Sequence, residues 1–391
     1  MAVYLDYNAT TPIDPEAAQV VAACLQSNFG NPSSRDHRFG WDAAEALEDA
    51  RDDIADCVGA TPRGLVFTSG ATESLNTALR GFVGFDGWAG KKILVGASEH
   101  SAVLEPCHWL SRRTGVELEL LAVDAQGRLD LQRLRDTLRA EGGAKSVLVA
   151  LMAANNETGV LHPVKQIAAI VHDAGAILLC DLTQAVGKVE VDLTSAGIDL
   201  AAFCAHKVYG PKGVGALWIS PRLEERDMRW QFEPLLLGGQ QESSRRGGTV
   251  NVAGALGFAR ACRNTIDVLP VDRPRIQALR NHFEAVVLEA IPGAQVNCLH
   301  SPRLPNTTSL CIRGVSARAL VRDMPDVALS TGSACASARR EPSHVLRAIG
   351  LSELEADACL RVSLGRPTVI GDIECALARI AASVRRFRVA A

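Results

Sequence analysis

The sequence lacks the features that mark membrane and nucleic-acid-binding proteins. Its longest apolar run, VLVALMAA at residues 147–154, is far shorter than the roughly 20 residues that cross a bilayer. Its 41 basic residues nearly balance 44 acidic ones, so the formal charge of −3 provides no general field for a polyanion. We therefore expect no membrane span and no direct nucleic-acid partner.

Paired cysteines are also lacking. The 11 cysteines are scattered and none stands in a C-x-x-C pair, which argues against a metal site and favours free thiols in a reducing compartment. The opening stretch MAVYLDYNATTP has neither the basic nor the apolar region of a secretory signal. We expect a cytoplasmic protein whose cysteines mostly fill the core.

The pattern that is present is an alternation of strands and helices. Between residues 65 and 220, short β-rich runs alternate with helical patterns, which predicts an α/β fold with a mostly parallel sheet wrapped by helices. Before it, apolar residues recur at steps of three and four over residues 37–58, which indicates an amphipathic helix. After it, the Gly-rich stretch at 235–249 is typical of a long loop.

The remaining segments predict a second, smaller lobe. Short strand patterns and helices follow residue 262, and the last helix shows apolar residues at helical spacing from Ile373 to Phe387. We expect residues 15–261 to form the large lobe, and residues 1–14 and 262–391 a smaller α+β lobe. The smaller lobe would carry a loop at about 328–343.

Functional side chains follow nearly every apolar run of the expected sheet. In open parallel sheets, ligands bind beyond the carboxyl ends of the strands, so these positions are the informative ones. In chain order they are SGATES at 69–74, Glu99 and His100, Asn155 and Asn156, Asp181, and His206 and Lys207.

Each of the first positions has an ordinary alternative. SGATES favours a phosphate at a helix start, although helix capping by Ser69 or Thr72 explains the same residues. His100 is either a core histidine or a ring that stacks on an aromatic ligand. Asn155 and Asn156 either form a turn or donate to a ligand oxygen.

Lys207 takes its meaning from its neighbours at the strand ends. A lysine beside a phosphate-binding helix start and a buried aspartate, Asp181, has the parts needed to hold pyridoxal phosphate as a Schiff base, with the aspartate keeping the pyridine nitrogen protonated. A partly desolvated amine can form an imine and later act as a base. Without these neighbours, Lys207 would be a surface lysine before the turn at Pro211, and Asp181 part of a structural salt bridge.

Two further residues stand out in the second lobe. Cys335 lies among small residues in STGSACASARREPS, which suggests a mobile exposed loop, and Arg339 and Arg340 would favour its thiolate. The alternative is an incidental loop cysteine. Arg361 alternates with apolar residues in CLRVSLGR, so it points off the apolar face and either clamps a carboxylate or is solvated.

Ordered motifs along nearly the whole chain resemble the cysteine desulfurases of the NifS/IscS type. These belong to the class V aminotransferase group of fold type I pyridoxal phosphate enzymes. The motifs are YLDYNATTP, FGNPSSRDHRFG, FTSGATES, ANNETG, DLTQAVGK, HKVYGPKG, STGSACAS, EPSHVLRAIGL and LRVSLGR. The long loop around GSACAS resembles the first group of the family rather than the SufS-like group.

The resemblance implies roles around the cofactor ring. Lys207 would be the Schiff-base lysine, Asp181 the partner of the pyridine nitrogen, and His100 the ring-stacking residue. Asn156 and Gln184 would bind near the ring oxygen.

The resemblance also implies a phosphate site and a dimer. Ala71, Thr72 and His206 would hold the phosphate of pyridoxal 5′-phosphate. Thr249 would join them from the other subunit of a homodimer.

The reaction implied is conversion of L-cysteine to L-alanine. Arg361 would hold the substrate carboxylate and Cys335 would be the nucleophile, which then carries the sulfur as a persulfide on its mobile loop to an acceptor protein. Iron–sulfur scaffolds, tRNA-thiolation enzymes and DNA-sulfur modification systems would all be served by the same donor site. The alternatives are a selenocysteine lyase or another class V lyase or aminotransferase, and a non-catalytic protein that binds sulfur or metal.

Two positions depart from the family pattern. The family usually has Ser or Thr followed by Gly before the His-Lys pair, whereas this chain has Cys204 and Ala205. A thiol donates a weaker hydrogen bond than a hydroxyl, so the phosphate contact at Cys204 is altered. Ser243 stands where the family commonly carries an arginine.

Overall fold

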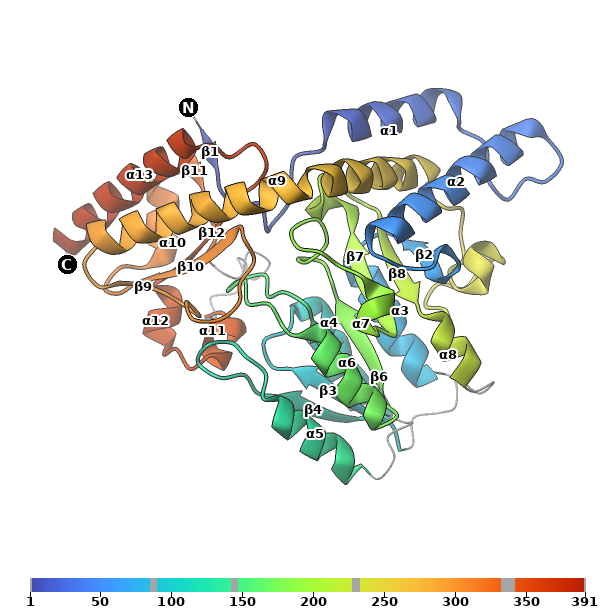
Figure 1. The fold of residues 1–391 in the computed structure, drawn as a ribbon, viewed down its shortest axis with the longest axis horizontal. Coiled ribbons are helices and arrows are strands. Elements are labelled where there is room, and N and C mark those ends of the chain that lie inside the picture. The colour runs from blue at the N-terminus through green and yellow to red at the C-terminus, as the bar shows by residue number, and fades with distance from the viewer. Residues whose placement is uncertain (1, 85–89, 142–146, 227–232, 332–341, 390–391) are drawn as a thin grey trace.

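The computed structural model describes residues 2–84, 90–141, 147–226, 233–331 and 342–389 (Figure 1). Its largest element is a seven-stranded sheet with the order β2-β8-β7-β6-β5-β3-β4. The strands are β2 (Leu65–Thr68), β3 (Lys92–Gly96), β4 (Glu117–Leu121), β5 (Val147–Met152), β6 (Ile177–Asp181), β7 (Leu200–Cys204) and β8 (Gly215–Ile219).

This sheet is mostly parallel, as predicted. β4, β3, β5, β6 and β7 pair in parallel, while β8 pairs antiparallel with both β7 and β2. β8 is therefore the antiparallel member among the seven described strands. The edge strand β4 is an element that the sequence analysis did not identify; its side chains are mostly exposed or half-buried.

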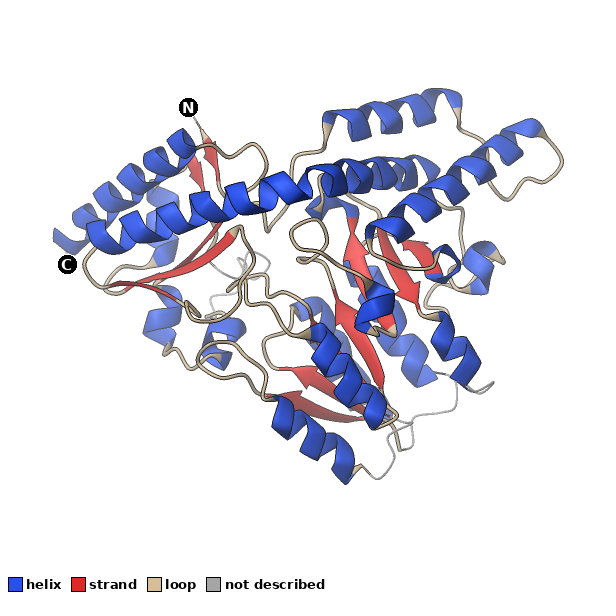
Figure 2. Cartoon of the chain, viewed as in Figure 1, coloured by secondary structure: helices blue, strands red, loops and turns tan. Residues whose placement is uncertain are grey.

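Helices cover both faces of the sheet (Figure 2). Successive residues of a strand enter different hydrophobic clusters: Leu94 packs in one, while Ile93 and Val95 pack in another. A sheet buried on both faces has near-continuous apolar strands, and such runs allow the strands to be predicted from the sequence. The covering helices are α2 (Arg38–Cys57), α3 (Ala71–Gly84), α4 (Ser101–Thr114), α5 (Leu131–Ala140), α6 (Val164–Asp173), α7 (Leu193–Ala196) and α8 (Pro221–Arg226).

A second hydrophobic core lies in the smaller lobe. It gathers Val3 and Leu5 with residues from Ile276 onward. Its strands are β1 (Val3–Tyr4), β9 (Ala294–Val296), β10 (Thr307–Ile312), β11 (Val327–Ala328) and β12 (Cys359–Ser363). Its helices are α10 (Ala317–Asp323), α11 (His344–Ala348), α12 (Glu353–Asp357) and α13 (Ile370–Val389).

One long helix joins the two cores. α9 (Val252–Ala290) runs from the large sheet to the small lobe and packs beside α1 (Pro15–Ser27) and α2 at one end and α13 at the other (Figure 1). It continues through residue 262, where we expected the small lobe to begin. The division at 1–14, 15–261 and 262–391 stays a proposal.

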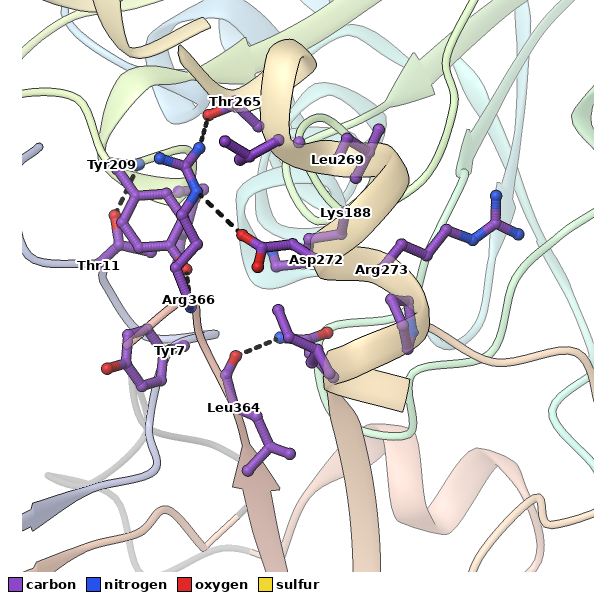
Figure 3. A pocket seen from close by; sticks show the side chains of 16 residues that line it. Tyr7, Thr11, Lys188, Tyr209, Thr265, Leu269, Asp272, Arg273, Leu364 and Arg366 are labelled. Atoms are coloured by element: carbon purple, nitrogen blue, oxygen red, sulfur yellow. Dashed lines mark hydrogen bonds and ion pairs between the residues drawn. The ribbon is translucent and has the colours of Figure 1, made fainter. Parts of the chain in front are cut away.

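Arg366 ties the lobes together near α9. Its guanidinium carbon lies 4.1 Å from the ring centre of Tyr209, and its Nε lies 3.8 Å from a carboxylate oxygen of Asp272 on α9 (Figure 3). Its backbone N–H donates to the Tyr209 hydroxyl over 2.7 Å. These contacts hold the β12–α13 turn against the large lobe.

Among the described helices, none is long and apolar enough to cross a membrane.

Candidate active site

The strand-end residues of the large sheet converge on one cavity of about 990 Å³. Residues from the N-terminal segment and from the small lobe complete its lining. The predicted site residues that line it are Ala71, Thr72, His100, Asn156, Asp181, Gln184, Cys204, His206, Lys207 and Arg361.

Two predicted residues are not among these. Thr249 is exposed and does not line the cavity of this chain, and its expected role is at the site of a second copy. Cys335, together with residues 332–341 of the expected loop, lies outside the described residues.

The start of α3 forms the corner of the cavity that is suited to bind a phosphate. Ala71 and Thr72 are the first two residues of α3, directly after β2, so their backbone N–H groups belong to the turn that lacks intrahelical acceptors. These N–H groups and the helix dipole favour an anion. Gly70 precedes them with a φ of +156°, and a Cβ added at Gly215 would meet its Cα at 2.6 Å. The close approach of two glycines shapes this corner.

Glu73 also lines the cavity, but its carboxylate is paired within the protein. Its carboxylate accepts from the Ser69 N–H over 2.7 Å and from Arg246 Nε over 3.0 Å. Burial opposes ionisation, but Arg246 and Ser69 lower the pKa of Glu73 below its usual value. The charge of this carboxylate is thus neutralised where an anion would bind.

Lys207 is held by the N-terminal segment. It ends the short 3-10 turn Ala205–Lys207 that follows β7. Its Nζ donates to the backbone carbonyls of Asn8 over 2.5 Å and Ala9 over 2.7 Å. Both acceptors are uncharged backbone carbonyls, which position the amine by hydrogen bonding.

His206, beside it, is a neutral imidazole. Burial first, and then Lys207, Lys212 and Lys188, lower the pKa of His206 to about 4. Its Nδ1 lies 3.2 Å from the hydroxyl oxygen of Thr10. At neutral pH it therefore contributes hydrogen bonds to the cavity rather than charge.

His100 caps α4 and lines the cavity. Its Nδ1 accepts from the Ala102 N–H over 3.1 Å, so in the neutral ring the proton is on Nε2. Burial first, and then Lys207, lower its pKa, while Asp181 raises it; the net direction is downward. Asp181 and Lys207 both influence this ring, and both line the same cavity.

Asp181 ends β6 in the buried sheet. It is 7% exposed and lies opposite Met152 and Ala202 in the ladder. Its Oδ1 accepts from the Thr183 N–H over 2.9 Å. The turn after the strand therefore orients the carboxylate into the cavity.

The two asparagines divide the roles that the sequence left open. Asn155 makes the turn, because its Oδ1 accepts from the N–H groups of Glu157 and Thr158, each over 2.9 Å. Asn156 lines the cavity instead, and its buried Oδ1 has no hydrogen-bond partner within the described part of the chain. The same holds for Thr183 Oγ1. Buried polar atoms are normally paired, so these two fit a polar ligand in the cavity.

Arg361 reaches the cavity from β12 of the small lobe. It is 3% exposed, so the solvated alternative is wrong. It donates from Nη2 to Asp6 Oδ1 over 2.7 Å and from Nη1 to the Asn156 carbonyl over 3.1 Å. This buried cation fits the carboxylate of a small substrate.

Several cavity residues were missed by sequence reasoning. Asn8 lines the cavity, and Asp6 pairs with Arg361 beside it; both belong to YLDYNATTP, a motif quoted only for its resemblance. His344 also lines the cavity, and its Nε2 lies 2.7 Å from the Glu99 carbonyl oxygen. The neighbouring Ser343 donates to Glu157 Oε2 over 2.6 Å. The motif EPSHVLRAIGL was the signal for this pair.

Cys204 and Ser243, the two residues that depart from the family pattern, lie in different environments. Cys204 is buried at the cavity wall; burial raises the pKa of its thiol to about 11, so it is a neutral thiol at neutral pH. Ser243 is exposed, has a φ of +55° and does not line the cavity. Nothing in the structure links the change at Ser243 to the cavity.

Comparisons with known proteins agree over nearly the full chain. The model of the class V aminotransferase family matches residues 3–375. A cysteine desulfurase IscS from Anaeromyxobacter sp. (strain Fw109-5) is 40% identical over 386 residues, which cover 99% of this chain and 93% of that protein. That identity and coverage are enough to show common family membership.

Solved structures give the same result. The NifS-like protein from Rickettsia africae ESF-5 is 30% identical, with a TM-score of 0.87 that covers 98% of this chain and 100% of that one. SspA, solved in complex with cysteine, is 30% identical, with a TM-score of 0.80 over 94% of this chain and 100% of that one. The chain therefore belongs to the class V aminotransferase family, among the cysteine desulfurases of the NifS/IscS type.

Proposed function

We propose that the cavity binds pyridoxal 5′-phosphate and L-cysteine, and that Lys207, Arg361 and Cys335 carry the reaction. As a member of its family the chain is an enzyme, a cysteine desulfurase that converts L-cysteine to L-alanine and retains the sulfur. The observation that carries the site assignment is the convergence of Lys207, Asp181 and Arg361, from two lobes, on one cavity.

The lining residues fit this cofactor. The start of α3 offers N–H donors for a phosphate, Asp181 offers a carboxylate for a ring nitrogen, and Asn156 Oδ1 is an unpartnered polar atom. The residues that would hold the cofactor are Ala71, Thr72, His100, Asn156, Asp181, Gln184, Cys204, His206 and Lys207, with Thr249 from a second copy of the chain. When bound, the cofactor supplies an electron sink for the pair left on the substrate α-carbon.

The chain's own residues would then divide the work. Arg361 holds the substrate carboxylate, and the amine of Lys207 takes the α-proton and returns it to the product. His100, whose pKa burial lowers, would lie against the cofactor ring as an uncharged imidazole. The Cys335 thiolate would attack the substrate sulfur and form a persulfide. The bond between that sulfur and the substrate β-carbon would break with its electron pair left on carbon, where a proton replaces the sulfur, and the Cys335 loop would present the persulfide to an acceptor.

Partners and location follow from the same reasoning. Cysteine as the substrate is supported by SspA, a neighbour solved in complex with cysteine. A homodimer would bring Thr249 to the second cavity. We also propose a cytoplasmic location, because the cysteines in the described ranges are free and mostly buried, which suits a reducing compartment. The acceptor would be an iron–sulfur scaffold or a thiolation enzyme.

The experiment is to measure alanine released from L-cysteine by the purified protein and by Cys335→Ala. We expect the variant to lose alanine formation but keep the bound cofactor. Cys375→Ala, on α13 outside the cavity lining, serves as the matched control and should turn over normally. Normal alanine release by Cys335→Ala would overturn the role of this cysteine.

A further inference from the structure

Lys188 is a lysine placed behind the active cavity, in the turn region that follows β6. It does not line the large cavity, but it lines a small neighbouring one of about 30 Å³. Lys207 lines both cavities, so the two lysines share the small one. Figure 3 shows Lys188 among the side chains of the small cavity, beneath α9.

A chain of hydrogen bonds connects Lys188 to Lys207. Lys188 Nζ donates to Gln184 Oε1 over 2.8 Å and to the Gln184 carbonyl over 3.3 Å. Gln184 Nε2 donates to the Asn8 carbonyl over 3.0 Å, and Lys207 Nζ donates to that same oxygen over 2.5 Å. One buried carbonyl is thus shared by Gln184 and Lys207.

This arrangement allows one orientation of the Gln184 amide. A protonated lysine can only donate and a backbone carbonyl can only accept, so Oε1 must face Lys188 and Nε2 must face Asn8. The NH₂ group of Gln184 carries a second proton beyond the one given to Asn8. Because Gln184 lines the active cavity, that NH₂ group acts there as a donor.

The two amines also influence each other electrostatically. Burial first, and then Lys207, lower the pKa of Lys188 to about 7. The interaction between two charges is mutual, so a charge on Lys188 equally disfavours a charge on Lys207. The other ionisable groups that influence Lys188 or share its small cavity are Cys204, Arg361, Tyr7, Tyr209, Asp272, Arg273 and Arg366.

We propose that Lys188 is a positioning residue that fixes the Gln184 amide as a donor toward the bound cofactor, and that its charge acts on the amine of Lys207, with which it shares the small cavity. The inference rests on the proposed function, because it assigns Lys188 a part at the same site. Lys188, the lysine of the DLTQAVGK motif, would thus orient Gln184, which neither Lys207 nor Asp181 does.

Two variants separate the two effects. Lys188→Met removes both the hydrogen-bond donor and the charge, whereas Lys188→Gln keeps an NH₂ donor for Gln184 Oε1 and removes only the charge. Lys165→Met is the control, because Lys165 is an exposed lysine on α6. Thermal unfolding of each protein verifies that it is folded, and if Lys188→Met does not fold, Lys188→Gln carries the test of the charge.

The first readout uses cofactor-free protein. The rate at which a small acylating reagent modifies Lys207 is measured against pH by mass spectrometry of the peptide. We expect the midpoint to move up by about one pH unit in both Lys188 variants, since a like charge is removed. An unchanged midpoint in both would overturn the electrostatic part.

The second readout is the dissociation constant of pyridoxal 5′-phosphate. We expect it to rise about fivefold in Lys188→Met and to stay within twofold of the parent in Lys188→Gln. Equal affinity in all proteins would overturn the orienting part. Failure of the proposed function is a separate result, because the parent itself would then bind no cofactor and release no alanine.

Discussion

Replacing Cys204 by serine tests the effect of the thiol that this chain has at the cavity wall, where the family usually has a hydroxyl. Cys204 ends β7, is 3% exposed and lines the cavity. The backbone N–H of Ala71, at the start of α3, hydrogen-bonds to its sulfur. Burial raises the pKa of the thiol to about 11, so at neutral pH it can offer only a weak S–H donor to a phosphate.

The expected gain comes from two opposing contributions. A hydroxyl that donates to a charged phosphate contributes about 1.5–3 kcal/mol, where a thiol contributes little. Against this, burying a hydroxyl costs about 1–3 kcal/mol, a cost that the Ala71 N–H keeps near its lower end by providing a partner. With the cost near 1 kcal/mol, the net gain is about 0.5–2 kcal/mol, so the dissociation constant of the cofactor should be about twofold to thirtyfold lower.

The assay is the loss of bound pyridoxal 5′-phosphate during dialysis, together with its dissociation constant by titration. Cys204→Ser should retain cofactor at least as well as the parent, and Cys204→Ala, which has no donor, should retain it no better. Faster loss from the serine variant than from the parent would refute the reasoning.

Three further predictions address other parts of the molecule. Ser244 has a φ of +64°, so Ser244→Gly should raise the free energy of unfolding by about 0.5–1 kcal/mol in urea denaturation, and a lower value would contradict the strain argument. Asp6→Asn should raise the KM for L-cysteine about tenfold and change kcat less, because Asp6 orients Arg361; a loss confined to kcat would count against this. Burial lowers the pKa of His162 from 6.5 to about 4, so protons bind the unfolded chain first and the free energy of unfolding falls as the pH drops from 6.5 toward 4. His162→Gln should reduce the fall measured between pH 7 and pH 5, and an equal fall would exclude His162 as its source.

Much of the large lobe could be predicted from local pattern. Strands buried on both faces are continuous apolar runs, and the helix predicted over 37–58 is found as α2 with Leu47 and Ile54 buried. The strand-end residues could be placed together because parallel strands present their carboxyl ends on one edge. His100 and Asp181 were located in this way.

The rest depended on contacts between distant segments. Arg361 pairs with Asp6 across 355 positions, and no local period carries that information. β8 runs antiparallel to both of its neighbours, and one of them, β2, precedes it by about 150 residues. β4 escaped notice because an exposed edge strand lacks the apolar run of a central one. The role proposed for Thr249 would need a second chain, so a single sequence could suggest it only through resemblance.

The central claim is that the amine of Lys207 carries the cofactor. The direct measurement is reduction of the cofactor-loaded protein with borohydride, followed by peptide mapping of the labelled lysine. The account predicts a pyridoxyl group on Lys207 and none on Lys188. A label on Lys188 or elsewhere, or a loaded protein with no trapped lysine, would contradict it.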